Sequence, residues 1–287
     1  MLKPRILHIA PANTSGVPGH FVQAERRLGY DSRLVTLFSD RRNYFSDICL
    51  NLPFIDVPLV RRVKQLVSHP DKLIITNRVR RPEQIPVTWT PHSGAEAVFV
   101  RWRDRLWKPR IERAVRKYAL DRFDVIQLDG GLGLYRSGDF VLRRHAKGCM
   151  LICCYTGSDL RTRGVIPEID AASDLNLSVE FDHIHLHPDI RHVPFPFDTS
   201  IRHLHQHHDN TRPVRIGHAP TNRAAKGSDL IIPVLEQLER DENTQTVLIE
   251  NMPYDQAMRA KQHCDLFVDQ IGDLGYGINA LEALAMQ

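Results

Sequence analysis

Long hydrophobic runs, paired cysteine motifs and a dinucleotide fingerprint are all missing from this sequence. No run of roughly eighteen apolar residues occurs, so a membrane-spanning helix is not expected. The five cysteines include no CxxC pair, which favours buried free thiols in a reducing cytoplasm over disulfides or a zinc site. The N-terminus has one short apolar run and no small-residue cleavage pattern, so we read it as a first strand and not as a secretory signal. We therefore expect a cytoplasmic protein.

What is present is the composition of a globular protein with an unevenly placed charge. Hydrophobic residues make up 42% of the 287 residues, which is enough for a sizeable core, and the length favours two domains. The net charge is only +4, but basic residues concentrate between Arg61 and Lys117, with Trp102 and Trp107 among them. Such a stretch is either a solvated helix face or a surface for an anionic partner. Peripheral contact of this 61–117 region with an anionic membrane is one hypothesis. Nucleic acid is not expected, because no nucleic-acid motif accompanies the charge.

Short apolar strands alternate with helical patterns along the whole chain. In the first half we predict strands at Arg5–Ala10, Ser32–Phe38, Asp124–Leu128, Met150–Tyr155, Ser178–Leu186 and His192–Val193, and helices at His20–Leu28, Asp104–Leu120 and Gly138–Ala146. In the second half we predict strands at Val214–His218, Thr246–Glu250 and Leu266–Val268, with helices at Ser228–Arg240 and Tyr254–His263 and a last one from Ile278. This alternation is typical of parallel sheets covered by helices.

The predicted fold class is therefore α/β, with two Rossmann-like doubly wound domains, of which the second is incomplete. We expect an N-terminal domain over 1–196, a linker over 197–213 with many polar and histidine residues, and a partial C-terminal domain over 214–287. Ligands of such sheets bind beyond the carboxyl ends of the strands, so the turns from strand to helix carry the chemical argument.

The first of these turns contains Gly16 and Gly19, just before a predicted helix. Glycine lets a backbone approach a ligand closely, and a helix start offers free amide groups. The spacing is not GxGxxG, so a dinucleotide site is not supported. Gly130–Gly133, after a later strand, is another near match, and a plain tight turn explains it as well.

The second turn follows the first strand of the second domain and contains Arg223, Lys226 and Gly227. Two cations at the mouth of a parallel sheet suit a diphosphate, because a guanidinium can clamp two oxygens while an ammonium acts as a point charge. Ser228 or Asp229 could equally only cap the helix that follows.

The third turn contains Gly275, Tyr276 and Gly277 and leads into a helix that carries Glu282 in its second turn. A carboxylate at such a place can accept hydrogen bonds from a ribose diol. The alternative is a simple glycine turn followed by an exposed glutamate.

Together, these turns resemble the C-terminal domain of GT-B glycosyltransferases, especially the large retaining family numbered four. The match runs over Val214–Met286 in the order of that family: a basic Arg…Lys-Gly element, a Gly-Tyr-Gly loop and a Glu-Ala-Leu-Ala segment. The first half is similar too, because Ile6–Phe38 resembles the first β-α-β unit of the family and Gly157–Asp159 its Gly-Ser-Asp turn. Pro194–Asp198 resembles its Pro-x-Pro-x-Asp entry to the hinge.

The resemblance implies a glycosyltransferase that moves a sugar from a nucleotide-sugar donor to a glycan or lipid acceptor, generally with retention. The implied donor-binding residues are Arg223, Lys226 and Gly227 for the diphosphate, Glu282 for the ribose, and the loop of Gly275, Tyr276 and Gly277. The loop from Gly16 to Gly19 would face the same cleft from the acceptor domain. No metal and no cofactor are implied, since side chains and helix dipoles take their place.

Three departures from the family bear on catalysis. Leu274 stands where the family has the first glutamate of its Glu-x7-Glu pattern, and Asp273 beside it is the substitute that we predict. Thr156 stands where the family often has histidine, and a hydroxyl is no base near neutral pH, which leaves Asp159 as the other catalytic candidate. The chain ends at Gln287 where the family continues, so we expect a fragment or a natural remnant.

Two alternatives to a transferase stay open: a non-catalytic sugar-nucleotide-binding module, and, with less support, a sugar-nucleotide epimerase. Histidine clusters also invite a metal hypothesis: His183, His185 and His187 alternate along a predicted strand, and His203, His205, His207 and His208 crowd the linker. No cysteine partner and no HExxH pattern supports a dedicated site, so no metal is predicted.

Overall fold

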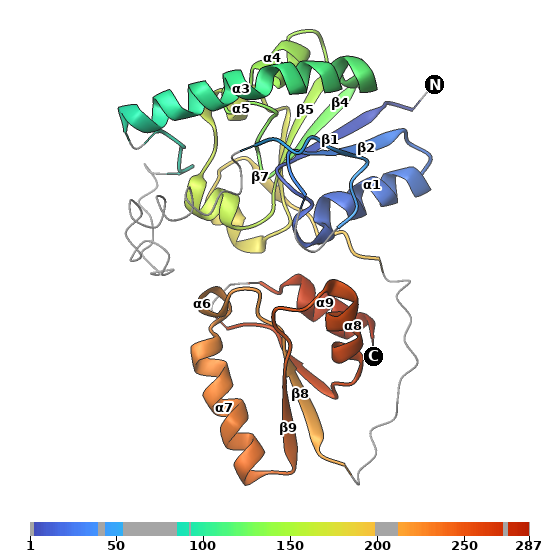
Figure 1. The fold of residues 1–287 in the computed structure, drawn as a ribbon, viewed down its shortest axis with the longest axis vertical. Helices are drawn as coiled ribbons and strands as arrows, with labels where there is room; N and C mark the ends of the chain where they lie inside the picture. The colour runs from blue at the N-terminus through green and yellow to red at the C-terminus, as the bar shows by residue number, and fades with distance from the viewer. Residues whose placement is uncertain are drawn as a thin grey trace. The chain divides into compact units, whose positions relative to one another are not determined.

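The computed structural model describes residues 3–39, 44–53, 85–91, 93–198, 212–271 and 275–286. The chain divides into two compact units, Met1–Pro196 (unit 1) and Phe197–Gln287 (unit 2). Each unit has a parallel sheet with helices packed against it (Figure 1). The predicted α/β class with two Rossmann-like units is confirmed by these two sheets.

In unit 1 the described residues form a seven-stranded parallel sheet in the order β3-β2-β1-β4-β5-β6-β7. Its strands are β1 (Ile6–Ala10), β2 (Ser32–Thr36), β3 (Ile48–Cys49), β4 (Val125–Asp129), β5 (Met150–Tyr155), β6 (Leu175–Ser178) and β7 (Ile190–His192). The strand order reverses between β1 and β4, which lie side by side although a long stretch of chain separates them. Ligand sites of open α/β sheets form at such a switch point.

Helices cover both faces of this sheet. They are α1 (Val17–Arg27), α3 (Gly94–Tyr118), α4 (Asp139–His145) and α5 (Pro167–Ala172), with short helical turns η1 (Thr14–Gly16), η4 (Leu120–Arg122), η5 (Asp159–Arg163) and η6 (Phe181–His185). Val22 of α1 packs with Leu34 of β2 on one face, whereas Trp107 and Ile111 of α3 belong to the large core on the other. Burial on both faces explains why the strands are apolar runs without alternation.

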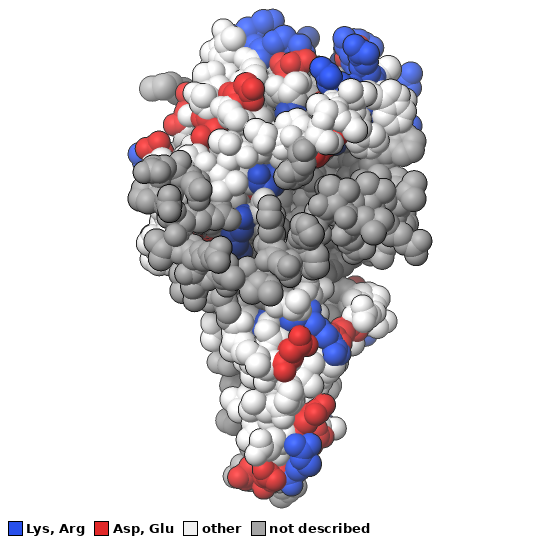
Figure 2. All heavy atoms as spheres, turned by 90° about the vertical axis from the view of Figure 1, so that its left-hand side faces the viewer, with Lys and Arg blue, Asp and Glu red and all other residues white. Residues whose placement is uncertain are grey.

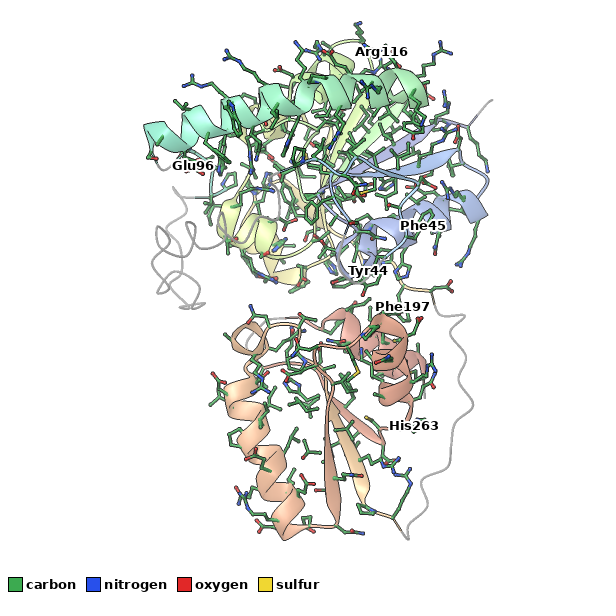
Figure 3. All side chains as sticks on the ribbon, in the orientation of Figure 1. Tyr44, Phe45, Glu96, Arg116, Phe197 and His263 are labelled. Atoms are coloured by element: carbon green, nitrogen blue, oxygen red, sulfur yellow. The ribbon has the colours of Figure 1, made fainter. Side chains whose placement is uncertain are left out.

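Helix α3 is the long basic helix, and it begins at Gly94 instead of the predicted Asp104. Ser93 caps it, because its Oγ accepts a hydrogen bond from the backbone N–H of Glu96 at 3.2 Å. Figure 3 labels Glu96 near the start and Arg116 near the end of the helix. Lys and Arg side chains gather in Figure 2 at the top of the view, where α3 lies. Residues 61–84 of the basic stretch lie outside the described residues.

Unit 2 has three described parallel strands in the order β10-β8-β9. They are β8 (Val214–His218), β9 (Thr244–Leu248) and β10 (Leu266–Val268), with helices α6 (Arg223–Lys226), α7 (Ser228–Asp241), α8 (Tyr254–Gln262) and α9 (Ile278–Ala285). Ile216 of β8 packs against Ile231 and Leu235 of α7. The buried His218 joins neighbouring elements, because its Nδ1–H donates to the Val268 carbonyl at 2.8 Å and its Nε2 accepts from Ser228 Oγ at 2.8 Å.

The strand predicted over Ser178–Leu186 is wrong beyond its first residue. The chain leaves the sheet after Ser178, whose Oγ accepts from Glu180 N at 2.9 Å and contacts His183 Nδ1 at 2.7 Å. These bonds turn the chain into η6, so His183 and His185 do not share a strand face. Within the described residues, no group of three or more His, Cys, Asp or Glu side chains is placed to hold a metal, and no helix is long and apolar enough to cross a membrane. The linker histidines His203–His208 lie outside the described ranges.

Candidate functional site

Unit 1 has a pocket of about 150 Å³ at the switch point of its sheet. Its walls come from the loop after β1, from the carboxyl end of β4, and from the turn between β5 and η5. The lining residues are Pro11, Ala12, Thr14, Pro18, Asp129, Gly130, Thr156, Ser158, Asp159 and Arg163. Thr156 and Asp159, which the sequence singled out, therefore lie in the same wall as Asp129, which it did not.

Asp159 accepts hydrogen bonds with both of its carboxylate oxygens. Oδ1 accepts from the amides of Gly157 and Leu160 at 2.9 and 2.8 Å, and Oδ2 accepts from the amide of Thr156 at 2.9 Å and from its hydroxyl at 3.3 Å. Because a carboxylate has about four acceptor positions, these four hydrogen bonds use them all. The geometry gives Asp159 a structural role in holding the turn after β5. Its predicted catalytic role stays a prediction.

Behind the pocket lies a buried ionic network centred on His8 of β1. His8 Nδ1 is 3.0 Å from Asp129 Oδ2, and Nε2 is 3.0 Å from Glu25 Oε2, while Gln127 donates to Asp129 Oδ1 at 2.9 Å. Burial lowers the pKa of His8, but the charges and hydrogen bonds of Asp129 and Glu25 outweigh it and raise the pKa to about 9. The imidazole is therefore a cation near neutral pH. It compensates the charge of the Asp129 carboxylate at the pocket wall.

The loop predicted around Gly16 and Gly19 borders the pocket, although neither glycine is among the lining residues. Gly16 has a φ of +74° and precedes α1. Gly19 N donates to Asn13 Oδ1 at 3.2 Å, and a Cβ at Gly19 would lie 2.6 Å from Asn13 Nδ2. Asn13 in turn donates to the Phe45 carbonyl at 2.7 Å, in the segment that Figure 3 marks with Tyr44 and Phe45. Glycine is thus needed here for close packing of the loop against α1.

In unit 2 the loops after all three strands meet at one edge of the sheet. Lys226, the last residue of the short helix α6 that follows β8, places its Nζ 2.9 Å from Asp269 Oδ1 and also donates to Gln270. Asp269 follows β10, and its Oδ2 accepts from the backbone N–H of Gly277 at 2.6 Å. Arg223 makes a two-bond ion pair with Glu250, which follows β9, at 2.8 and 2.7 Å. The structure thus brings the two predicted donor-binding segments together.

The glycines of these segments differ in how strongly the structure requires them. Gly227 has a φ of +69°, and a Cβ there would lie 2.6 Å from Ile271 Cγ1 and 2.7 Å from the Ile271 carbonyl oxygen. A Cβ at Gly277 would lie 2.6 Å from Lys226 Nζ. Gly275, by contrast, has open space around its Cβ position, and Tyr276 beside it is exposed. Gly227 and Gly277 therefore allow the close approach of the two segments.

Glu282 is buried in an ion pair with Lys261 of α8. The same ammonium donates to Asn279 Oδ1 at 2.6 Å, and Asn279 Nδ2 donates to the Ala219 carbonyl at 2.9 Å. This chain of contacts fastens α9 to α8 and to the loop after β8. The side chain of Glu282 is only 4% exposed, so a ribose would reach it only after rearrangement. Ribose binding by Glu282 stays a prediction.

Asp273, the second catalytic candidate, and Leu274 lie outside the described residues. The network of His8, Asp129 and Glu25 and the partner of Glu282 were not predicted from the sequence. Asp129 has a recognisable sequence signal, because it directly follows the predicted strand Asp124–Leu128 and precedes Gly130. Lys261 has no such signal, since its contacts with α9 arise only in three dimensions.

Comparison with known proteins gives a likeness in fold alone. No protein-family model matches the chain, and no curated protein matches it in sequence. Among solved structures, the glycosyltransferase SnogD from Streptomyces nogalater is 14% identical with a TM-score of 0.45, over 99% of this chain and 78% of that one. The UDP-GlcNAc 2-epimerase from Neisseria meningitidis, in a structure bound to UDP-GlcNAc, is 8% identical with a TM-score of 0.42, over 98% of this chain and 75% of that one. A glycotransferase of kitacinnamycin is 11% identical with a TM-score of 0.45, over 98% of this chain and 78% of that one.

Proposed function

We propose that the chain is a glycosyltransferase that transfers a sugar from a nucleotide-sugar donor to a glycan or lipid acceptor. In this proposal unit 2 binds the nucleoside diphosphate part of the donor, and the pocket of unit 1 binds the acceptor. The observation that carries the proposal is the meeting of three loops in unit 2. They bring Arg223, Lys226 and the amide of Gly277 to the carboxyl edge of one parallel sheet.

This edge has the chemistry that a diphosphate requires. Lys226 and Arg223 supply two cations, and the start of α9 after Gly277 supplies amide groups at the positive end of a helix dipole. Both cations are ion-paired with carboxylates, so an incoming diphosphate would compete with Asp269 and Glu250 for them. The same contacts would neutralise the charge that builds up on the diphosphate as it leaves.

The acceptor pocket offers little general-base chemistry of its own. Asp159 is occupied by four hydrogen bonds, Asp129 is paired with the His8 cation, and Thr156 carries a hydroxyl. These facts support a transfer that relies on the donor phosphate and on positioning, with retention at the anomeric carbon as part of the proposal. They equally favour the second candidate, a sugar-nucleotide-binding module without turnover.

The first experiment measures thermal stabilisation of the protein by a panel of nucleoside diphosphates at matched ionic strength. A ligand that binds only the folded state raises the melting temperature, and one base is expected to do so more than the others. The Lys226→Ala variant should lose this effect, whereas Arg259→Ala should keep it, because Arg259 of α8 is exposed and carries the same charge in unit 2. No stabilisation by any nucleotide, from a chain that melts cooperatively, would overturn the donor site.

Turnover separates the two candidates. A radiolabelled donor of the base identified above is incubated with the protein and a mixture of glycan and lipid acceptors, and product anomers are assigned by NMR. Transfer that depends on Lys226 supports the enzyme, and nucleotide binding without turnover supports the binding module. Isomerisation of the donor without acceptor would indicate an epimerase.

A further inference from the structure

Arg136, in the loop after β4 of unit 1, has two buried guanidinium nitrogens without a hydrogen-bond partner among the described residues. Its Nε and Nη1 atoms are inaccessible to solvent and, among the described residues, have no acceptor within reach. Its guanidinium carbon lies 4.7 Å from the ring centroid of Trp89, which therefore covers it with an aromatic face. Native proteins rarely leave buried donors of a charged group unpaired, because the lost hydration is costly. Within the described ranges, no acceptor serves Nε and Nη1 of Arg136.

The surroundings of Arg136 contain two other arginines, Arg163 of η5 and Arg103 of α3. Burial, followed by the charges of Arg163 and Arg103, lowers the pKa of Arg136 to about 10, against smaller opposing effects of Asp104 and Glu96. Arg136 therefore stays a cation at neutral pH but lies among like charges. An anion placed there would relieve both the missing hydrogen bonds and this repulsion.

Asp104, whose charge raises the pKa of Arg136, is already engaged elsewhere. Its Oδ1 accepts from Nη2 and Nε of Arg103 at 2.8 and 3.2 Å. Its Oδ2 accepts from the backbone N–H of Arg136 at 3.0 Å, which fixes the loop but gives no acceptor to Nε and Nη1 of the guanidinium. Asp104 thus compensates Arg103 and positions Arg136.

Arg163 extends the same cationic region into the pocket. It lines the pocket wall, and it donates hydrogen bonds to two backbone carbonyls, from Nε to Gly164 at 3.0 Å and from Nη2 to Gly130. Burial lowers its pKa, whereas Asp159 raises it. Asp159 accepts hydrogen bonds from backbone amides of the turn after β5. N–H groups of Arg163 that do not donate to Asp159 can therefore donate to a ligand.

We propose that Arg136 and Arg163 form an anion subsite beside the pocket of unit 1, and that it takes a phosphate or carboxylate carried by the acceptor. Guanidinium groups suit this task, because their planar fork matches two oxygens of either anion. The assignment to the acceptor rests on the proposed function. The anion subsite itself does not, because it follows from the buried donors of Arg136.

The test begins with inorganic phosphate, added at constant ionic strength with chloride as the reference. Phosphate is expected to raise the melting temperature and to shift the ¹⁵N–¹H signals of the arginine Nε groups, including that of Arg136. Arg136→Met should weaken phosphate binding about 10- to 100-fold, which is the value of one or two charge-assisted hydrogen bonds. Arg113→Met, at an exposed position of α3, removes the same charge and should leave binding unchanged.

Stability of the ligand-free variants separates an anion subsite from a structural arginine. Because Nε and Nη1 of Arg136 are buried without acceptors among the described residues, Arg136→Met should leave the melting temperature the same or raise it. A fall of that temperature with unchanged phosphate binding would overturn the proposal. So would the absence of any phosphate effect on the wild-type Arg136 signal, a measurement that needs no variant.

The ligand class is resolved by three further probes: glucose 6-phosphate, glucuronate, and vesicles of phosphatidylglycerol, each compared with glucose or neutral vesicles. The source with the strongest Arg136-dependent binding identifies the acceptor chemistry. Repeating the phosphate titration on Lys226→Ala excludes binding in unit 2. If nucleotides fail to bind while phosphate still binds through Arg136, the proposed function fails and the subsite stands. If nucleotides bind but phosphate does not bind through Arg136, the subsite is overturned and the proposed function is not.

Discussion

The Asp269 carboxylate lies between Lys226 and the loop before α9, with Oδ1 2.9 Å from Lys226 Nζ and Oδ2 2.6 Å from Gly277 N. It thus occupies the two contacts that a phosphate would be expected to make at this edge. The side chains of Lys226 and Asp269 are only 15% and 10% exposed, so their pairing is partly shielded from solvent.

The first prediction concerns this pair. Asp269→Asn keeps an acceptor for Gly277 N but removes the charge that competes for Lys226. We expect the affinity for the nucleoside diphosphate to rise about three- to tenfold, which corresponds to roughly 1 kcal/mol for a partly shielded ion pair. Isothermal titration calorimetry measures the change, with Asp255→Asn on α8 as the control for lost charge. An unchanged affinity would mean that Asp269 does not compete with the ligand.

The second prediction compares two glycines of the proposed donor site. Gly227→Ala should destabilise unit 2 by about 1–3 kcal/mol, because φ is +69° and the added Cβ would meet Ile271. Gly275→Ala, whose Cβ would meet no described residue within 4 Å, should change stability by less than about 0.5 kcal/mol. Urea denaturation followed by circular dichroism distinguishes the two. Equal losses in both variants would contradict the close contact between the loops.

The third prediction concerns the buried pair of Lys261 and Glu282. Removing one partner leaves a buried charge, so Lys261→Met should cost about 3–5 kcal/mol. The double variant Lys261→Met with Glu282→Leu should cost less than Lys261→Met alone. Thermal unfolding of both variants gives the comparison, and additive losses would argue against a direct pairing. The same Lys261→Met protein tests ribose binding, because a freed Glu282 should then bind nucleosides more tightly than the corresponding bases.

The fourth prediction is a pH dependence that originates at His8. The pKa of His8 is raised from 6.5 to about 9, so its stabilisation is complete below the unfolded value of 6.5 and is lost as the pH rises toward 9. At about 1.4 kcal/mol per pKa unit the loss amounts to up to roughly 3 kcal/mol. Urea denaturation of the wild-type protein between pH 6 and 9.5 measures it. The NMR titration of the His8 ring should have its midpoint near pH 9. A midpoint near the ordinary value of 6.5 would refute the cationic imidazole.

Much of the fold follows from the sequence, because parallel strands buried on both faces are apolar runs that need no distant partner to be recognised. The predicted strand Met150–Tyr155 is found unchanged as β5, and Leu266–Val268 as β10. The error at Ser178–Leu186 has a local cause, since hydrogen bonds of Ser178 Oγ turn the chain where β-branched and apolar residues suggest a strand. The early start of α3 had a sequence signal, Ser93 three residues before Glu96, that was not used.

The candidate site is less accessible to sequence reasoning. Glycines and cations in turns after strands can be recognised, and Lys226 and Gly277 are indeed brought together. The role of a carboxylate at such a place cannot be recognised from the sequence. The same acidic residue can bind a ribose, accept hydrogen bonds from the backbone of a turn, or pair with a buried cation. Asp159 and Glu282 were predicted for ligand chemistry, and their nearest partners in the structure are backbone amides and a lysine. The sequence does not single out Arg136, because the lack of acceptors for its Nε and Nη1 depends on its neighbours in three dimensions.

The four hydrogen bonds of Asp159 have a consequence for the energetics of ligand binding. They hold the amides of Thr156, Gly157 and Leu160 without help from any ligand, so this wall of the pocket is preorganised. An acceptor would then lose its own freedom on binding but would not have to order this turn. Slow amide hydrogen exchange at these three residues in the ligand-free protein would show that the turn is already ordered before a ligand binds.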